Sequence, residues 1–164
     1  LASALIHRPK VLLLDEPTGG VDPVARQEFW HLLIALLREG SAVLVSTPYM
    51  DEAARCHRIG FMKKGRLISE GTPDAMRSVL EGRVLELRGT PLTEIRHHAL
   101  DVPGVENVQA FGDRLHLRVA EGLADDVMVR LPQQLGQAGL KVESLRPLPA
   151  TLEDVFIALS HETA

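Results

Sequence analysis

Two adjacent carboxylates, Asp15 and Glu16, follow a run of four large apolar residues, Val11 to Leu14. The apolar run predicts a strand that is buried on both faces, as in a parallel sheet, and Pro17 prevents the strand from continuing. Successive side chains of a strand point to opposite faces, so one carboxylate can face a metal ion while the other faces a water molecule. These residues alone fit equally well a buried strand that ends in a solvated acidic turn.

The residues after Pro17 predict a turn, a helix and a second strand. Asp22 is a natural helix N-cap and Pro23 a natural first helical residue. Apolar residues at a spacing of 3.6 continue this helix to about Glu39. The apolar run 42–47 then predicts a buried strand parallel to the first. Both strand tips should therefore lie at one edge of the sheet, where open α/β sheets bind their ligands.

Two motifs at fixed spacing carry a family resemblance. The segment 12–18 (Leu-Leu-Leu-Asp-Glu-Pro-Thr) and the turn 20–23 (Gly-Val-Asp-Pro) resemble the Walker B motif and the D-loop of ABC transporter ATPases. The resemblance implies that Asp15 orients Mg²⁺ through water, that Glu16 polarises the attacking water, and that Asp22 reaches across the interface between two ATPase subunits. A glycosidase also uses two carboxylates, but neighbouring strand residues point apart and do not flank one bond.

The tip of the second strand departs from the family pattern. In the resembled family a histidine follows a Ser-Thr pair in the switch region and contacts the γ-phosphate, whereas here Ser46 and Thr47 are followed by Pro48. Proline lacks both an imidazole donor and a backbone N–H. We therefore expect Pro48 to be a degenerate nucleotide-binding position. His57 is a poor replacement, because it follows a helical turn and fits a solvated helix end.

The resemblance covers only the C-terminal part of an ATPase domain. No Gly-x-x-x-x-Gly-Lys-Ser/Thr phosphate loop occurs in the sequence, and no signature motif or glutamine-bearing loop is found. Residues 1–7 are typical of a helix, which in the family follows the signature motif. We therefore expect a fragment. ATP and Mg²⁺ are the cofactors implied for the complete subunit, and neither is expected to bind this chain alone.

The character of the chain changes at Gly82, which predicts two domains. Residues 1–81 would be the C-terminal portion of an ABC ATPase domain, closed by a β-hairpin. Residues 82–164 would be an accessory or regulatory α+β domain with a terminal helix. Its elements predict a ferredoxin-like β-α-β-β-α-β order, with Pro132 inside the second helix. The expected fold class is thus α/β: the C-terminal part of a P-loop NTPase parallel sheet with helices, followed by a small ferredoxin-like domain.

Composition limits the other classes of function. The 164 residues include 18 basic and 22 acidic side chains, for a formal net charge of −4, so there is no electrostatic footprint for nucleic acid. Cys56 is the only cysteine, which excludes a disulfide within the chain and permits a reducing compartment. No apolar run approaches the roughly 18 residues of a membrane-spanning helix.

Two functions stay open. The first is an ATP-binding and ATP-hydrolysing subunit of an ABC transporter. The run 151–156 (Thr-Leu-Glu-Asp-Val-Phe) resembles the terminal segment of drug- and lipid-exporter ATPases and favours an exporter. The implied partners are a transmembrane permease and a second ATPase domain, with the subunit cytoplasmic and peripheral at the inner face of the cell membrane. The alternative, favoured by Pro48, is a non-catalytic, degenerate module derived from such an ATPase. Whether this chain is itself an enzyme stays open.

Overall fold

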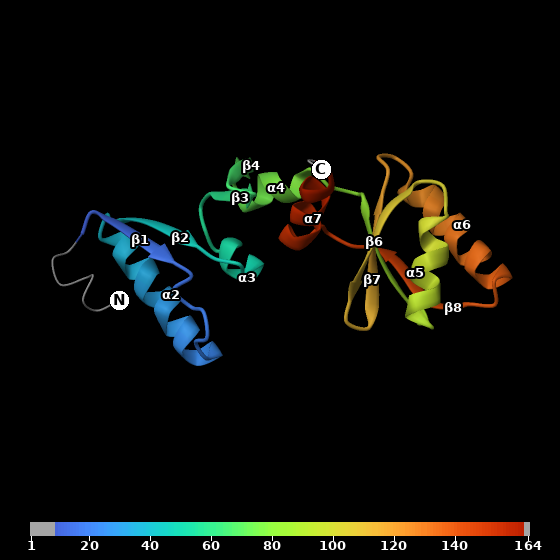
Figure 1. The fold of residues 1–164 in the computed structure, drawn as a ribbon, viewed down its shortest axis with the longest axis horizontal. Coiled ribbons are helices and arrows are strands. Elements are labelled where there is room, and N and C mark those ends of the chain that lie inside the picture. Colours follow the sequence, from blue (N-terminus) through green and yellow to red (C-terminus); the bar gives the residue numbers. More distant parts are fainter. Residues whose placement is uncertain (1–8, 163–164) are drawn as a thin grey trace. The chain divides into compact units, whose positions relative to one another are not determined.

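The computed structural model describes residues 9–162 of a chain that forms two compact units, residues 1–55 and 56–164 (Figure 1). The helix expected over residues 1–7 lies outside the described residues. The fold is mixed α/β, with a two-stranded parallel sheet, a β-hairpin and a four-stranded antiparallel sheet. The domain boundary expected at residue 82 stays a prediction. In the described part of the chain, no helix has the length and apolar character needed to cross a membrane.

The N-terminal unit is a strand–helix–strand arrangement followed by a short helix. Its elements in chain order are β1 (Val11–Asp15), α2 (Pro23–Arg38), β2 (Ala42–Ser46) and α3 (Met50–Ala53). Strands β1 and β2 pair in parallel with Asp15 opposite Ser46, so both strands end at the same edge. Asp22 Oδ1 accepts hydrogen bonds from the N–H groups of Val24 and Ala25, each at 3.0 Å. The predicted strands, helix and N-cap are confirmed.

The expectation that these strands are buried on both faces is wrong. Leu12 is buried, but Val11, Leu13 and Leu44 are 60%, 70% and 67% exposed. Helix α2 runs along the two-stranded sheet (Figure 1) and can cover only one of its faces. An apolar run therefore predicts which residues are suited to burial, whereas the coverage itself depends on neighbouring elements.

The C-terminal unit begins with an antiparallel β-hairpin and continues into a larger sheet with helices. Its elements in chain order are β3 (Ile59–Lys63), β4 (Arg66–Gly71), α4 (Pro73–Ser78), β5 (Val84–Thr90), α5 (Leu92–Leu100), β6 (Val105–Phe111), β7 (Arg114–Val119), α6 (Ala124–Gln137), β8 (Lys141–Pro147) and α7 (Leu152–Glu162). The predicted β-α-β-β-α-β order is confirmed from β5 to β8. Helix α6 continues through Pro132, as expected.

The four strands of the larger sheet are ordered β6-β7-β5-β8, and every neighbouring pair is antiparallel. Helices α5 and α6 lie side by side on one face of this sheet (Figure 1). Strand alternation directs the leucines of β5 and β7 into the core beneath these helices, while Glu86 and His116 belong to the opposite face. The fully buried members of this core are Leu85, Leu87, Ile95, Ala99, Leu117, Val119, Val127, Leu131 and Leu135.

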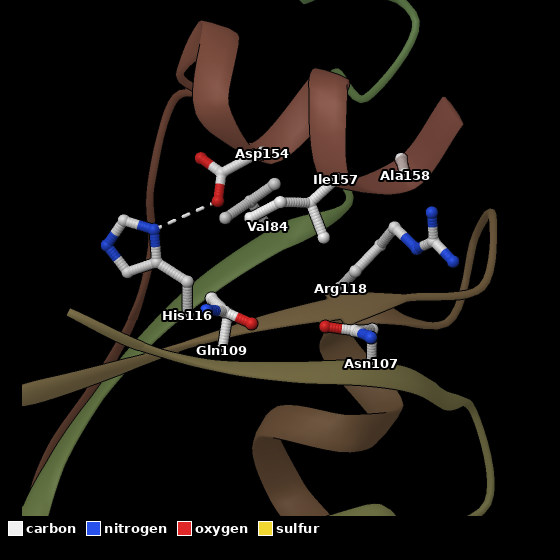
Figure 2. Close-up of a pocket in the computed structure, with 8 residues that line it drawn as sticks. All are labelled: Val84, Asn107, Gln109, His116, Arg118, Asp154, Ile157 and Ala158. Atoms are coloured by element: carbon white, nitrogen blue, oxygen red, sulfur yellow. Dashed lines mark hydrogen bonds and ion pairs between the residues drawn. The ribbon is translucent and has the colours of Figure 1, made fainter. Parts of the chain in front are cut away.

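Helix α7 packs against that opposite face. Figure 2 shows His116 of β7 directed toward Asp154 of α7 beside a small cavity, and His116 Nδ1 lies 3.1 Å from Asp154 Oδ1. Asp154 Oδ2 also accepts hydrogen bonds from the backbone N–H of Thr151 at 2.8 Å and from its hydroxyl at 2.7 Å. Farther along α7, the rings of Phe156 and Phe61 meet at 5.3 Å between centroids. Helix α7 therefore joins the hairpin to the four-stranded sheet.

This arrangement predicts a pH-dependent stability for the C-terminal unit. Burial raises the pKa of the Asp154 carboxyl, but the hydrogen bonds from His116 and Thr151 outweigh burial and hold that pKa below its ordinary value of 3.8. A carboxyl whose pKa is lower in the folded state stabilises the fold fully above its unfolded pKa. The contribution is lost as the pH falls through the folded pKa.

We expect Asp154→Asn to lower the unfolding free energy at neutral pH by about 1–3 kcal/mol, because one charged hydrogen-bond acceptor of a buried pair is lost. The difference between parent and variant should shrink as the pH falls below 3.8. Urea unfolding at several pH values, followed through nuclear magnetic resonance signals of β5 to β8, measures this difference. Glu143→Gln, at an exposed position of β8, is the control. A difference that stays constant down to strongly acid pH would contradict the prediction.

Candidate functional site

The paired ends of β1 and β2 bring two carboxylates and a serine together. Ser46 Oγ donates a hydrogen bond to Asp15 Oδ1. The backbone N–H of Glu16 donates to the Ser46 carbonyl at 3.0 Å and to the Ser46 hydroxyl at 3.2 Å. Asp15, Glu16 and Ser46 are all exposed. Exposed carboxylates at the carboxyl ends of parallel strands lie where α/β sheets bind ligands, as the sequence predicts.

Glu16 has an unusual backbone conformation. Its φ of 42° lies in the left-handed region, which residues other than glycine seldom adopt. Strand β1 ends at Asp15, so the alternation of a regular strand does not govern how Asp15 and Glu16 are oriented relative to each other. That the two carboxylates point to opposite faces therefore stays a prediction. Strained residues are often found at functional sites, and here the two hydrogen bonds to Ser46 hold the conformation.

Glu52 is the site residue that sequence reasoning missed. It is fully buried in α3, and its two oxygens bind different strand ends. Thr18 Oγ1 donates to Glu52 Oε1 at 2.6 Å, and Thr47 Oγ1 donates to Glu52 Oε2 at 2.7 Å. The sequence pattern gives only two adjacent acids, Asp51 and Glu52. A usable signal in the sequence is the threonine that follows each strand, Thr18 and Thr47. A buried hydroxyl needs a hydrogen-bond acceptor, and one carboxylate can serve both.

Several groups keep Glu52 ionised. Burial raises the pKa of the Glu52 carboxyl, but the hydrogen bonds from Thr18 and Thr47 oppose burial. Trp30 and the positive charge of Arg26 lower the pKa further, so it lies below its ordinary value. Arg26 Nε is 3.7 Å from Glu52 Oε1, and the Arg26 guanidinium lies over the Tyr49 ring at 4.5 Å. The carboxylate thus connects β1, β2 and α2.

The remaining candidate residues lie on either side of this cluster. Pro48 is exposed between β2 and α3, immediately after Thr47. Asp22 is exposed at the start of α2, and one of its oxygens serves as the helix cap. The structure therefore places Asp15 and Glu16 beside the Ser46–Pro48 tip, while Asp22 lies one loop away.

The residues at the strand ends fit a magnesium ion held partly by water. Within residues 9–162, no group of three or more His, Cys, Asp or Glu side chains has the geometry to hold a metal ion. Mg²⁺ sites that act on phosphates use one or two carboxylates together with water and the substrate's phosphate oxygens, not a complete protein cage. Asp15, oriented by the Ser46 hydroxyl, supplies one such carboxylate.

A second buried carboxylate lies in the C-terminal unit. Glu86 accepts hydrogen bonds from Arg146, at 3.0 and 2.9 Å, and from Arg114 at 3.0 Å. The hydrogen bond from Arg146 lowers the pKa of the Glu86 carboxyl, Arg114 lowers it further, and both outweigh burial. The two arginines satisfy Glu86 within the fold, so this cluster binds strands β5, β7 and β8 together.

Comparisons with known proteins agree with the motifs at the strand ends. Residues 71–160 match the family model described as "ATP-binding protein DrrA1-3-like, C-terminal domain". The Nod factor export ATP-binding protein I of Paraburkholderia xenovorans is 39% identical over 164 residues, which cover 98% of this chain and 50% of the relative. The probable multidrug ABC transporter ATP-binding protein YbhF of Escherichia coli is 49% identical over 78 residues, 48% of this chain and 14% of that protein. The chain thus spans about half the length of the Nod factor export relatives it matches.

Proposed function

Because this chain belongs to the ABC transporter ATP-binding proteins and carries a DrrA1-3-like C-terminal domain, we propose that the complete protein is the ATP-hydrolysing subunit of an ABC exporter. One observation carries the proposal. Asp15 and Glu16 lie at the end of β1, hydrogen-bonded to Ser46 at the end of the parallel strand β2. This chain would supply the part of the catalytic centre that binds the metal and activates water.

Each residue has a separate task in this proposal. Asp15, held by the Ser46 hydroxyl, orients Mg²⁺ through water, and the bound ion would neutralise charge on the phosphates. Glu16 holds the attacking water and accepts its proton. Asp22 serves the interface with a second ATPase domain. Phosphoryl transfer depends mainly on positioning and charge stabilisation, which suits side chains held at rigid strand ends.

The proposal extends to the rest of the chain. The four-stranded sheet with its two helices would be a ferredoxin-like accessory domain with a regulatory role. The exposed apolar face of β1 and β2 supports the idea that these strands form part of a larger P-loop NTPase sheet in the complete subunit. The partners would be a transmembrane permease and a second ATPase domain, at the cytoplasmic face of the membrane. The names of the relatives, Nod factor export and multidrug transport, favour export.

Pro48 favours a second candidate function. A complete protein with proline at the switch position would lack the donor that the family's histidine provides, and a non-catalytic interaction module derived from an ABC ATPase would tolerate that loss. The two candidates differ in one measurable property: only the catalytic subunit hydrolyses ATP, and it does so in a Mg²⁺-dependent manner.

The test compares the complete subunit with this chain. We expect the complete subunit to bind ATP and hydrolyse it with its permease, and the 164-residue chain to bind none up to about millimolar nucleotide. Affinity for the phosphates comes mainly from backbone N–H groups and a lysine of a phosphate loop, and this sequence contains no such loop. Isothermal titration calorimetry and phosphate release measure both proteins. Micromolar binding by the chain would contradict the prediction, and a complete subunit without hydrolysis would favour the non-catalytic module.

A further inference from the structure

The hydrogen-bonded strand pair ends just before the proposed catalytic centre. The β1–β2 pairing fixes the chain as far as Asp15 and Ser46, and the last bond of the pair is donated by the Glu16 N–H. Beyond these points the β1 chain enters the loop that contains Thr18, and the β2 chain continues through Thr47. Another group must therefore set the relative position of the two ends, because the strand hydrogen bonds no longer do so.

Glu52 is placed to do this. Its oxygens are divided between the two ends, with Thr18 on Oε1 at 2.6 Å and Thr47 on Oε2 at 2.7 Å. The exposed fraction of Glu52 is 0% and that of Thr18 is 1%, so water does not compete for the bond between them, whereas Thr47 is half-buried. Thr47 Oγ1 also accepts the Tyr49 N–H at 3.1 Å, which ties the residues flanking Pro48 into the same network.

We propose that Glu52 is a positioning residue of the ATPase centre, which acts through Thr18 and Thr47 to hold Glu16 and the end of β2 at the distance that hydrolysis needs. This inference rests on the proposed function, because it assigns Glu52 a task in that reaction. Glu52 is fully buried, so it acts through the two threonines and not on the nucleotide itself. A displacement of about 1 Å in a reacting group can lower a rate about 10²-fold. Thr18 lies two positions after Glu16, so the loss of its bond to Glu52 can lower turnover strongly.

Substitutions that preserve shape separate this role from simple stability. Glu52→Gln keeps the volume but replaces one acceptor oxygen with an N–H₂ donor, so one threonine hydroxyl loses the acceptor for its proton. Thr18→Val and Thr47→Val remove one hydroxyl each, whereas Thr18→Ser and Thr47→Ser keep it. Leu33→Ala, in the buried face of α2, is the matched control that weakens the same unit, because a leucine side chain makes no hydrogen bond to the strand ends.

In the complete subunit with its permease, we expect Glu52→Gln and both valine variants to lower kcat about 10- to 100-fold with KM for ATP changed less than about twofold. The serine variants should recover most of the turnover. Leu33→Ala should lower the melting temperature but leave kcat per folded molecule near that of the parent. Unchanged kcat in Glu52→Gln, or an equal loss in Leu33→Ala, would overturn the positioning role.

Hydrogen exchange provides a readout that does not depend on hydrolysis. In Glu52→Gln we expect faster amide exchange in residues 17–21 and 47–49, with protection of β1 and β2 unchanged. Uniform exchange changes over the whole N-terminal unit would show a merely structural role and overturn the inference. If the unsubstituted subunit hydrolyses no ATP, the proposed function fails and the positioning role fails with it. Selective exchange changes would then show that Glu52 holds the strand ends for some other purpose.

Discussion

Replacing Pro48 with histidine is expected to raise the kcat of the complete subunit by about 10²–10³ with little change in nucleotide Kd. The position lies immediately after Thr47, at the end of the strand that holds the Glu16 N–H. An imidazole there can donate a hydrogen bond to the γ-phosphate as charge develops on it, and proline can donate nothing. Binding should change less than turnover, because most phosphate contacts come from other residues.

The experiment needs a control that separates the added donor from the removed proline. Proline also restricts the residue before it, Thr47, to extended geometry. Pro48→Ala releases that restriction without adding an imidazole, so it should recover little of the gain. Each version is paired with the permease, and kcat and nucleotide Kd are measured together. Equal turnover in the proline and histidine versions would mean that this position does not act on the phosphate, or that another group has taken over the task.

Local sequence patterns predicted the elements of the fold well where each element carries its own signals. Helix α2 begins after Asp22 and at Pro23 because a side-chain cap and a fixed φ favour that start in any context. Helix α6 continues through Pro132 because its buried leucines on one face outweigh the lost backbone bond.

Contacts between distant segments were not predictable in the same way. Glu86 and His116 follow the polar half of a strand alternation, which is typical of a solvent-facing side, yet both are buried. Their burial depends on arginines of other strands and on α7, which approaches 38 residues after His116. The exposure of Leu13 has the same kind of cause, because the coverage of a sheet face is set by elements elsewhere in the chain.

The candidate site shows most clearly the difference between local signals and contacts between distant segments. Asp15, Glu16 and Asp22 were identified from motif spacing because they belong to one short segment of the chain, and Pro48 was identified from the Ser46-Thr47 pair that precedes it. Glu52 was missed because its partners, Thr18 and Thr47, follow two strands that helix α2 separates in the sequence. Only the folded chain brings these partners together. Buried polar groups satisfy one another across the fold, so the residues that hold a site in place are harder to read from sequence than those that face the ligand.

The proposed role of Glu16 as the base predicts a large loss of turnover when its carboxylate is removed. Glu16→Gln keeps the size of the side chain but cannot accept a proton from water. In the Pro48→His subunit we expect kcat to fall by about 10²–10⁴, the usual contribution of a general base, with nucleotide Kd unchanged. Glu28→Gln, at an exposed position of α2, should have no effect.

The two substitutions should also depend on each other. If residues 16 and 48 act on the same water and phosphate, the gain from Pro48→His requires the Glu16 carboxylate, and the effects will not add. We therefore expect Pro48→His to raise kcat less than about threefold in the Glu16→Gln background, compared with about 10²–10³ in the parent. Four subunits, made with and without each change and assayed with the permease, complete the cycle. A full gain in the Glu16→Gln background would show that the two strand ends act independently. The proposal that Glu16 is the base would then be wrong.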